Sequence, residues 1–161
     1  MRNAIAGLAL ASAVSLVPTA ARADTPIVIG PVTDEGVVAV FDCPGFQVLN
    51  HYVTTFVARQ MVDKKGNVIR LVGQTWGVDT FVNAATGREI ESRYHNNANI
   101  DLRTNVGSMS GVITNINVPG LGSVFKDVGH LVVNDAGAII FRSGTHQWID
   151  GDFAGICAAL E

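Results

Sequence analysis

The four histidines are the first residues that could do chemistry, since imidazole transfers protons near neutral pH and binds metals. They are His51, His95, His130 and His146. No two are separated by two or four residues, the spacings that bring histidines together on one strand or one helix. Histidines on neighbouring strands could still meet, but most such residues are surface or hydrogen-bonded groups. The sequence therefore predicts no metal site.

Carboxylates are the second candidate group. Asp79 and Asp101 could face each other across neighbouring strands as an acid–base pair, but Asp42 and Asp127 are equally available. The chain has no G-x-S-x-G nucleophile elbow, no Walker motif and no dinucleotide-binding glycine pattern. We assign no catalytic residue, expect no cofactor, and leave open whether the protein is an enzyme.

Aromatic residues spread over several expected strands form the third candidate group. Small-molecule pockets are lined mainly by apolar and aromatic side chains. The same rings could instead fill the core of a β-barrel. Both interpretations stay open at the level of the sequence. The candidate ligand-binding residues are Trp76, Tyr94, Phe125, Phe141 and Trp148.

The overall charge excludes two classes of partner. Lys and Arg number 11 against 14 Asp and Glu, and only 16% of residues are charged. This balance provides no basic surface for nucleic acid or for an anionic membrane. Apolar residues make up 48% of the chain, which is too many for a disordered protein. We expect a folded chain that binds neither nucleic acid nor, in its mature form, a membrane.

Residues 1–23 have the pattern of a secretory signal peptide. A basic start precedes an apolar run at 4–17, and Ala21-Arg22-Ala23 supplies the small-x-small site that signal peptidase accepts. The run is shorter than the roughly 20 residues of a membrane-spanning helix. We therefore expect cleavage before Asp24, secretion, and one domain over residues 24–161.

Secretion gives the two cysteines a structural meaning. Cys43 lies near the start of the mature chain and Cys157 near its end. In an oxidising compartment an isolated pair most simply forms a disulfide, although two free thiols are the alternative. A disulfide here would hold the two ends of the domain together.

The mature chain is a succession of segments rich in Val, Thr, Ile and Phe. Each ends at Gly combined with Asn, Asp or Pro, the residues that form tight turns. The expected strands cover residues 37–41, 46–62, 68–82, 89–104, 112–118, 124–133 and 138–148, and a short helix is expected at 152–160. Helices do not alternate with these strands, so a parallel α/β sheet is excluded.

Two closed architectures fit such a meander: an up-and-down barrel and a β-sandwich. Long sequential hairpins favour the barrel, in which the first and last strands pair and no edge remains. We therefore expect an all-β fold, an antiparallel up-and-down barrel of about eight strands with a short C-terminal helix. The β-sandwich is the alternative.

Alternation of polar and apolar residues predicts the faces of the strand that begins at Glu89. Its even positions, including Tyr94, Ile100 and Leu102, should point inwards, while Arg93, His95 and Asp101 should face water. The segment 70–82 is apolar on both faces, which is typical of a strand covered on both sides, for example at a contact between copies of the chain. A homo-oligomer is compatible with this pattern.

A family resemblance rests on turns and cysteines. The run from Phe41 to Val48 with its Cys-Pro-Gly turn, the turn at 83–87, the later glycine hairpins and the terminal Cys157 resemble a group of small secreted actinobacterial proteins. These are similar in layout to barrels of the calycin and allene-oxide-cyclase type. The Gly-x-Trp signature of lipocalins is missing, because Gln74 and Thr75 precede Trp76. The resemblance implies a barrel and carries no catalytic residue.

Three functions fit these observations. The barrel could bind a small, largely apolar molecule in its interior, it could be a cyclase or isomerase that uses the same cavity, or it could be a structural or interaction protein with a filled barrel. Isolated polar groups among apolar side chains in the interior would favour an enzyme. We expect the first function, a secreted β-barrel that binds a small apolar ligand.

Overall fold

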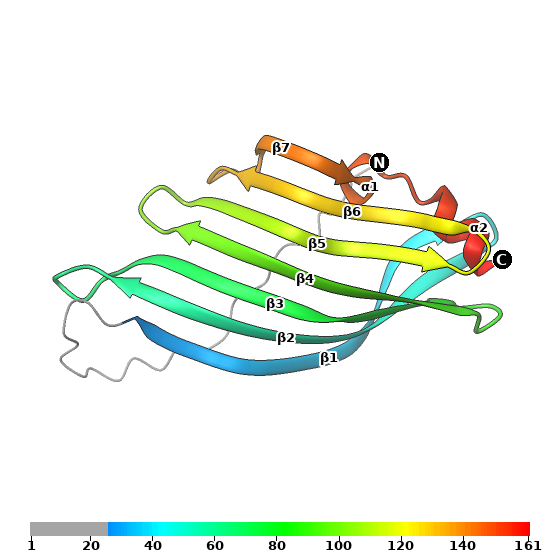
Figure 1. Ribbon diagram of the computed structural model, residues 1–161, viewed down its shortest axis with the longest axis horizontal. Coiled ribbons are helices and arrows are strands. Elements are labelled where there is room, and N and C mark those ends of the chain that lie inside the picture. The colour runs from blue at the N-terminus through cyan, green and yellow to red at the C-terminus, as the bar shows by residue number, and fades with distance from the viewer. Residues whose placement is uncertain (1–25) are drawn as a thin grey trace.

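The structure is a computed structural model that describes residues 26–161, and it consists of one antiparallel sheet followed by two short helices (Figure 1). Each strand pairs with its neighbours in sequence, so the expected all-β up-and-down meander is confirmed. The elements are β1 (Ile27–Cys43), β2 (Phe46–Val62), β3 (Val68–Asn83), β4 (Glu89–Asp101), β5 (Val106–Val118), β6 (Gly122–Val133), β7 (Ile139–His146), α1 (Gln147–Asp150) and α2 (Ala154–Leu160).

Asp and Asn side chains fold back on the backbone in four of the links between strands, including the β4–β5 link, where Asp101 accepts the backbone N–H of Arg103 at 2.9 Å. Asp63 accepts hydrogen bonds from the backbone N–H groups of Lys65 and Asn67, at 2.8 and 2.9 Å. Asn83 and Asn134 accept equivalent bonds in the β3–β4 and β6–β7 links. These local bonds stabilise the turns where the sequence predicts them.

The expected closure of the barrel is wrong. The sheet has seven strands, β1 and β7 are its two edges, and it is open. Strand β7 has only eight residues and the chain turns into α1 directly after it. The segment after β7 brings Trp148 and Phe153 between β1 and β6, so aromatic rings bridge the gap at this end in place of an eighth strand.

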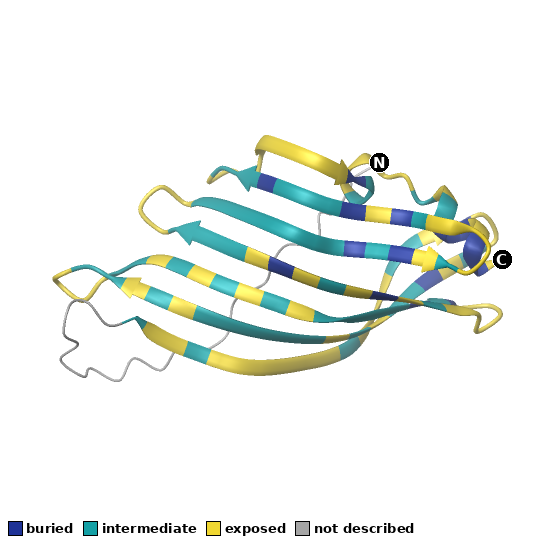
Figure 2. Cartoon of the chain, in the orientation of Figure 1, coloured by how far each residue is buried: buried dark blue, intermediate teal, exposed yellow. Residues whose placement is uncertain are grey.

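The two faces of the sheet differ in burial. We call inner the face that carries Val48, Phe81, Ile116 and Phe125, all fully buried. The opposite, outer face carries the exposed Val53, Val72 and Trp76. Figure 2 shows that buried positions lie on β4, β5, β6 and α2, while β1 and β7 are mostly exposed. The inner face is the more buried one along the length of the sheet, so it is the concave side of the curved sheet.

The predicted register of β4 is confirmed within the strand. Tyr94 and Ile100 point to the inner face and are half-buried, whereas Arg93 and His95 are exposed on the outer face. Leu102 was expected inside, but it lies in the turn after the strand and 38% of its surface is exposed. The even-numbered face of β4 continues inwards through its polar members too, because Ser92 and Asn96 are both buried.

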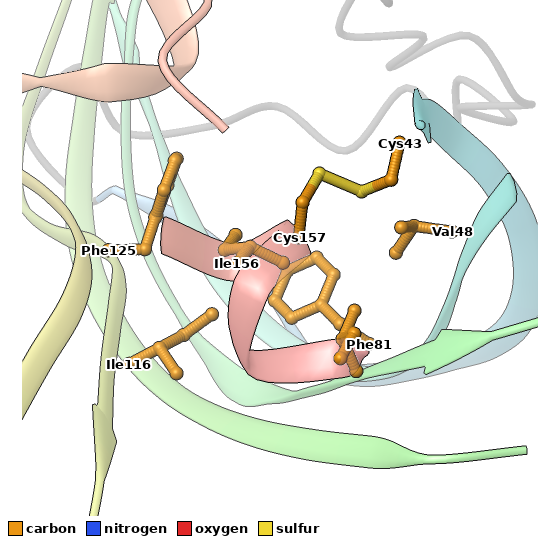
Figure 3. Close-up of a cluster of buried hydrophobic side chains, with 8 residues drawn as sticks. Cys43, Val48, Phe81, Ile116, Phe125, Ile156 and Cys157 are labelled. Carbon is orange, nitrogen blue, oxygen red and sulfur yellow. A yellow bond between two sulfur atoms is a disulfide. The ribbon is translucent and has the colours of Figure 1, made fainter. Parts of the chain in front are cut away.

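The hydrophobic core lies at one end of the sheet, around α2. Figure 3 shows Ile156 of the helix between Val48 and Phe81 on one side and Ile116 and Phe125 on the other. The predicted pairing of Cys43 with Cys157 is confirmed, with the two Cα atoms 5.6 Å apart. The disulfide joins the end of β1 to α2 and so fastens the C-terminal segment to the N-terminal strand. Helix α2 matches the predicted C-terminal helix in position.

Candidate binding site on the inner face

A group of polar side chains crosses the inner face next to the core. Register places Thr54, Gly77 and Tyr94 side by side on β2, β3 and β4. Tyr52 and Asp79 occupy the adjoining row. The side chain of Asn50 reaches Asp79. We call this group of side chains the polar band, and its members are Asn50, Tyr52, Thr54, Asp79 and Tyr94. All five residues are half-buried.

Two hydrogen bonds connect the polar band across strands. The Asn50 side-chain amide donates to Oδ1 of Asp79 at 3.0 Å. The hydroxyl groups of Thr54 and Tyr94 form the second bond. Each bond joins side chains of two strands, so the relative positions of these groups are set by the sheet and not by a loop.

Two glycines leave room for the phenol ends of the tyrosines. Tyr94 covers Gly77, where an added Cβ would stand 2.7 Å from the phenolic oxygen and would collide with the carbonyl oxygen of Val53. Tyr52 covers Gly36 in the same way, with an equivalent distance of 2.7 Å. Only a residue without a side chain fits beneath each ring. The rings therefore form part of the surface of the concave face.

The electrostatic environment of the polar band makes ionisation of its groups costly. Burial raises the pKa of Asp79, against the opposing effect of the Asn50 hydrogen bond. Burial likewise raises the pKa of Tyr94, and the charge of Asp79 adds to this effect, while the bond with Thr54 opposes it. The register places the two groups in adjoining rows of the inner face, which is why the charge of Asp79 acts on Tyr94.

Asn50 carries an unsatisfied acceptor. Its Oδ1 is shielded from solvent and has no hydrogen-bond partner among residues 26–161. A buried acceptor without a partner costs about 1–3 kcal/mol. The hydrogen bonding of the polar band is therefore incomplete in the protein alone.

Apolar side chains lie on both sides of the polar band. Towards α2, Val48 and Phe81 lead into the core. In the other direction the inner face carries two more polar residues, Thr75 and Asn96. Its apolar residues there are half-buried or buried, and they are Phe56, Leu71, Ala98, Ile100, Met109 and Leu131. The inner face thus offers apolar side chains on both sides of the polar band.

The five aromatic residues singled out from the sequence do not form one group. Phe125 and Trp148 pack together in the core, with ring centroids 5.4 Å apart. Tyr94 belongs to the polar band. Trp76 projects from the outer face with 39% of its surface exposed, and Phe141 is 52% exposed on the edge strand β7. Of the five, only Tyr94 is therefore retained in the candidate site.

A second polar network is buried beneath α1. Nδ1 of His146 lies 3.0 Å from Oδ1 of Asp127, and both side chains are about 1% exposed. The other oxygen of Asp127 accepts the backbone N–H of Trp148 at 3.0 Å. The indole N–H of Trp148 in turn donates to Thr114 at 2.8 Å. Asp127, His146 and Thr114 are buried and Trp148 is half-buried, and each has a partner, so the network holds α1 on the sheet.

The remaining candidates for chemistry are not assembled. Asp79 lies on the inner face and Asp101 on the outer face, where it pairs with Arg103 at 2.7 Å. They therefore form no carboxylate pair. Within residues 26–161 no group of three or more His, Cys, Asp or Glu side chains is arranged to hold a metal.

Two open surface depressions lie on the outer face. One, of about 410 Å³, is lined mainly by β1, β2 and β3 around His51. The other, of about 500 Å³, lies between Arg70, Asp101 and His130. Each mixes polar and apolar side chains; Tyr52 borders the first, and the other four members of the polar band line neither. The inner face remains the surface where half-buried polar groups and apolar side chains are combined.

Asn50, Tyr52 and Thr54 were not identified from the sequence. A signal for them exists, since Asn50, Tyr52 and Thr54 alternate along one expected strand and Asp79 shares a face with Leu71, Thr75 and Phe81. That signal needs the pairing register between β2 and β3 before it points to one place.

Comparison of the chain with protein-family models, with curated proteins and with solved structures finds no match. Among the described residues, no helix is long and apolar enough to cross a bilayer. The signal peptide expected at 1–23 lies outside the residues that the structure describes. The candidate site therefore has to be judged on its own geometry.

Proposed function

We propose that this protein binds one small, largely apolar molecule on the inner face of its sheet. The observation that carries the proposal is the polar band, which is half-buried and has apolar side chains on both sides. Small-molecule sites combine a concave apolar surface with a few well-placed polar groups in this way. The apolar part of the ligand would lie over Leu71, Ile100 and Met109, with its polar end at Asp79.

The core end forms the base of the proposed site. Phe125, Trp148 and Phe153 already fill the space beside α2, so the ligand would lie on the other side of the polar band. Side chains thus fill the interior at one end of the molecule only. At the opposite end, inner residues such as Phe56 and Ile100 are only half-buried and leave apolar surface for a ligand.

We also propose that the protein acts outside the cell after removal of residues 1–23. The disulfide between Cys43 and Cys157 supports this, because such bonds form and persist in oxidising compartments. Mass spectrometry of the protein from culture supernatant is expected to give a chain that begins at Asp24. A secreted chain that retains Met1 would contradict the proposed cleavage.

A cyclase or isomerase is the second candidate function, and one observation favours it. Asp79, whose pKa is raised by burial, and the Tyr94 hydroxyl lie on the same face. A raised pKa makes the carboxylate a stronger proton acceptor, and a phenol beside it can donate a proton. To separate the two functions, an unsaturated ligand is incubated with the protein, recovered, and analysed by chromatography and mass spectrometry. An isomerised product indicates an enzyme, and unchanged ligand indicates a binding protein.

The binding proposal is tested by calorimetric titration with neutral polyenes and terpenoid alcohols. Ala98 lies on the inner face between Gly73 and Met109, so Ala98→Phe fills the proposed site. Its neighbour Asn97 is exposed on the outer face, and Asn97→Phe adds the same ring outside it. We expect saturable binding that Ala98→Phe abolishes and Asn97→Phe leaves intact. Equal loss in both folded variants, or no binding of any compound, would contradict the proposal.

A further inference from the structure

We infer that the ligand carries a protonated amino group and that Asp79 is its counter-ion. This inference rests on the proposed function and adds the chemical class of the ligand. Its starting point is the distribution of charge between the two faces of the sheet.

The cationic side chains of β1–β6 all lie on the outer face. Register places Arg59, Arg70, Arg93 and Lys126 there, opposite the face that holds the core. On the inner face of the same strands the carboxylates are Asp34, Asp79 and Asp127, of which Asp127 is paired with His146. On β7 the register places one cation, Arg142, on the inner side, where it is paired with Asp150 at 2.7 Å. The inner face of β1–β6 is therefore acidic without a compensating cation of its own, and it favours a positively charged ligand.

Asp79 lacks a counter-ion of its own. The ion pairs among residues 26–161 do not include it. Its one side-chain hydrogen bond comes from the neutral amide of Asn50. A half-buried carboxylate is normally paired, because removing its charge from water is costly. An ammonium group would supply the missing charge and would lower the pKa that burial raises.

The groups around Asp79 suit an ammonium ion better than a carboxylate ligand. An ammonium has three N–H donors and no acceptor. Beside the Asp79 carboxylate, Oδ1 of Asn50 is an acceptor without a partner. It is shielded from solvent, so a small rotation of the Asn50 side chain is needed before a donor reaches it. The phenol ends of Tyr52 and Tyr94 lie over Gly36 and Gly77, and aromatic rings near a site attract cations.

The test uses three probes that share one apolar body: 2-(naphthalen-2-yl)ethylamine, 2-(naphthalen-2-yl)ethanol and 2-naphthylacetate. Each is titrated calorimetrically into the full mature protein at pH 7. We expect the amine to bind at least tenfold more tightly than the alcohol, and the carboxylate to bind more weakly than both. Asp79→Asn should abolish the preference for the amine, so that amine and alcohol bind with equal affinity.

Asp101→Asn is the matched control, since it removes one carboxylate from the outer face of the same sheet. It should leave all three affinities unchanged. Equal binding of amine and alcohol to the wild-type protein would overturn the inference and leave the proposed function standing. If none of the probes and none of the neutral ligands binds, both fall together. The comparison on the wild-type chain decides the matter even if Asp79→Asn does not fold.

Discussion

The ring of Phe41 on β1 stacks on the ring of Phe153, with centroids 4.3 Å apart and planes only 8° from parallel. Phe153 also lies 6.0 Å from Phe125 on β6 and 5.2 Å from Trp148. One side chain thus connects strands at opposite sides of an open sheet. In a closed barrel the first and last strands pair. Here the segment between β7 and α2 instead covers the apolar end of the sheet with aromatic rings.

Phe153→Ala should therefore destabilise the protein. We expect a loss of about 2 kcal/mol, less than for a fully buried Phe because Phe153 is half-buried. Urea unfolding followed by circular dichroism measures it as a lower midpoint. Phe141→Ala is the control, since Phe141 is exposed on β7, and it should change stability by about 0.5 kcal/mol or less. Equal effects of the two changes would contradict the bridging role of Phe153.

Loss of the disulfide should destabilise the domain more. The bond joins residues separated by 114 positions, and in the chain-entropy model closing so long a loop stabilises the native state by up to about 4–5 kcal/mol. The double change Cys43→Ser with Cys157→Ser should lower the unfolding midpoint accordingly. Peptide mapping without reduction should recover the linked pair from the secreted wild-type protein. Alkylation of both thiols without prior reduction would show that the bond does not form.

Breaking the buried network under α1 is expected to be costly. Asp127→Ala leaves His146 without its carboxylate partner and leaves the backbone N–H of Trp148 without an acceptor. Removal of one member of a buried pair typically costs about 3–5 kcal/mol. Thermal unfolding should show this as a large fall in Tm. Asp152→Ala is the control, because Asp152 is exposed and bonds only to Gln147 among the described side chains.

Asp79→Asn should stabilise the folded protein as the pH rises. Because burial raises the pKa of Asp79 above its ordinary value of 3.8, the stability that this group contributes is present at low pH. That stability is lost as the pH rises through the folded-state pKa. The variant lacks this loss, so its advantage over the wild type should grow between pH 3 and pH 7, as followed by urea unfolding at each pH.

The opposite sign is expected for Asp101→Asn. Hydrogen bonds from Arg103 hold the pKa of Asp101 below its ordinary range, so ionised Asp101 favours the folded state near neutral pH. Asp101→Asn should therefore be slightly less stable than the wild type at pH 7. This difference should shrink as the pH falls to 2. If Asp79→Asn behaved like Asp101→Asn, the burial of Asp79 against the sheet would be disproved.

The sequence by itself determined the local features of this protein. The alternation of polar and apolar residues in β4 and the Asp63, Asn83 and Asn134 turns depend on neighbours a few positions apart, so strands, turns and the inner side of β4 could be predicted. The disulfide was predictable because Cys43 and Cys157 have no other partner.

Only the tertiary structure decided how the sheet ends and where its polar groups meet. Closure depends on whether β1 reaches β7, and Phe153 with Trp148 occupies the intervening space instead. The polar band depends on the register that sets Thr54 and Gly77 beside Tyr94, and a shift of one residue would have moved every side chain to the other face. Sheet closure and strand register are decided by competing contacts between residues distant in sequence, so a local sequence pattern does not predict them.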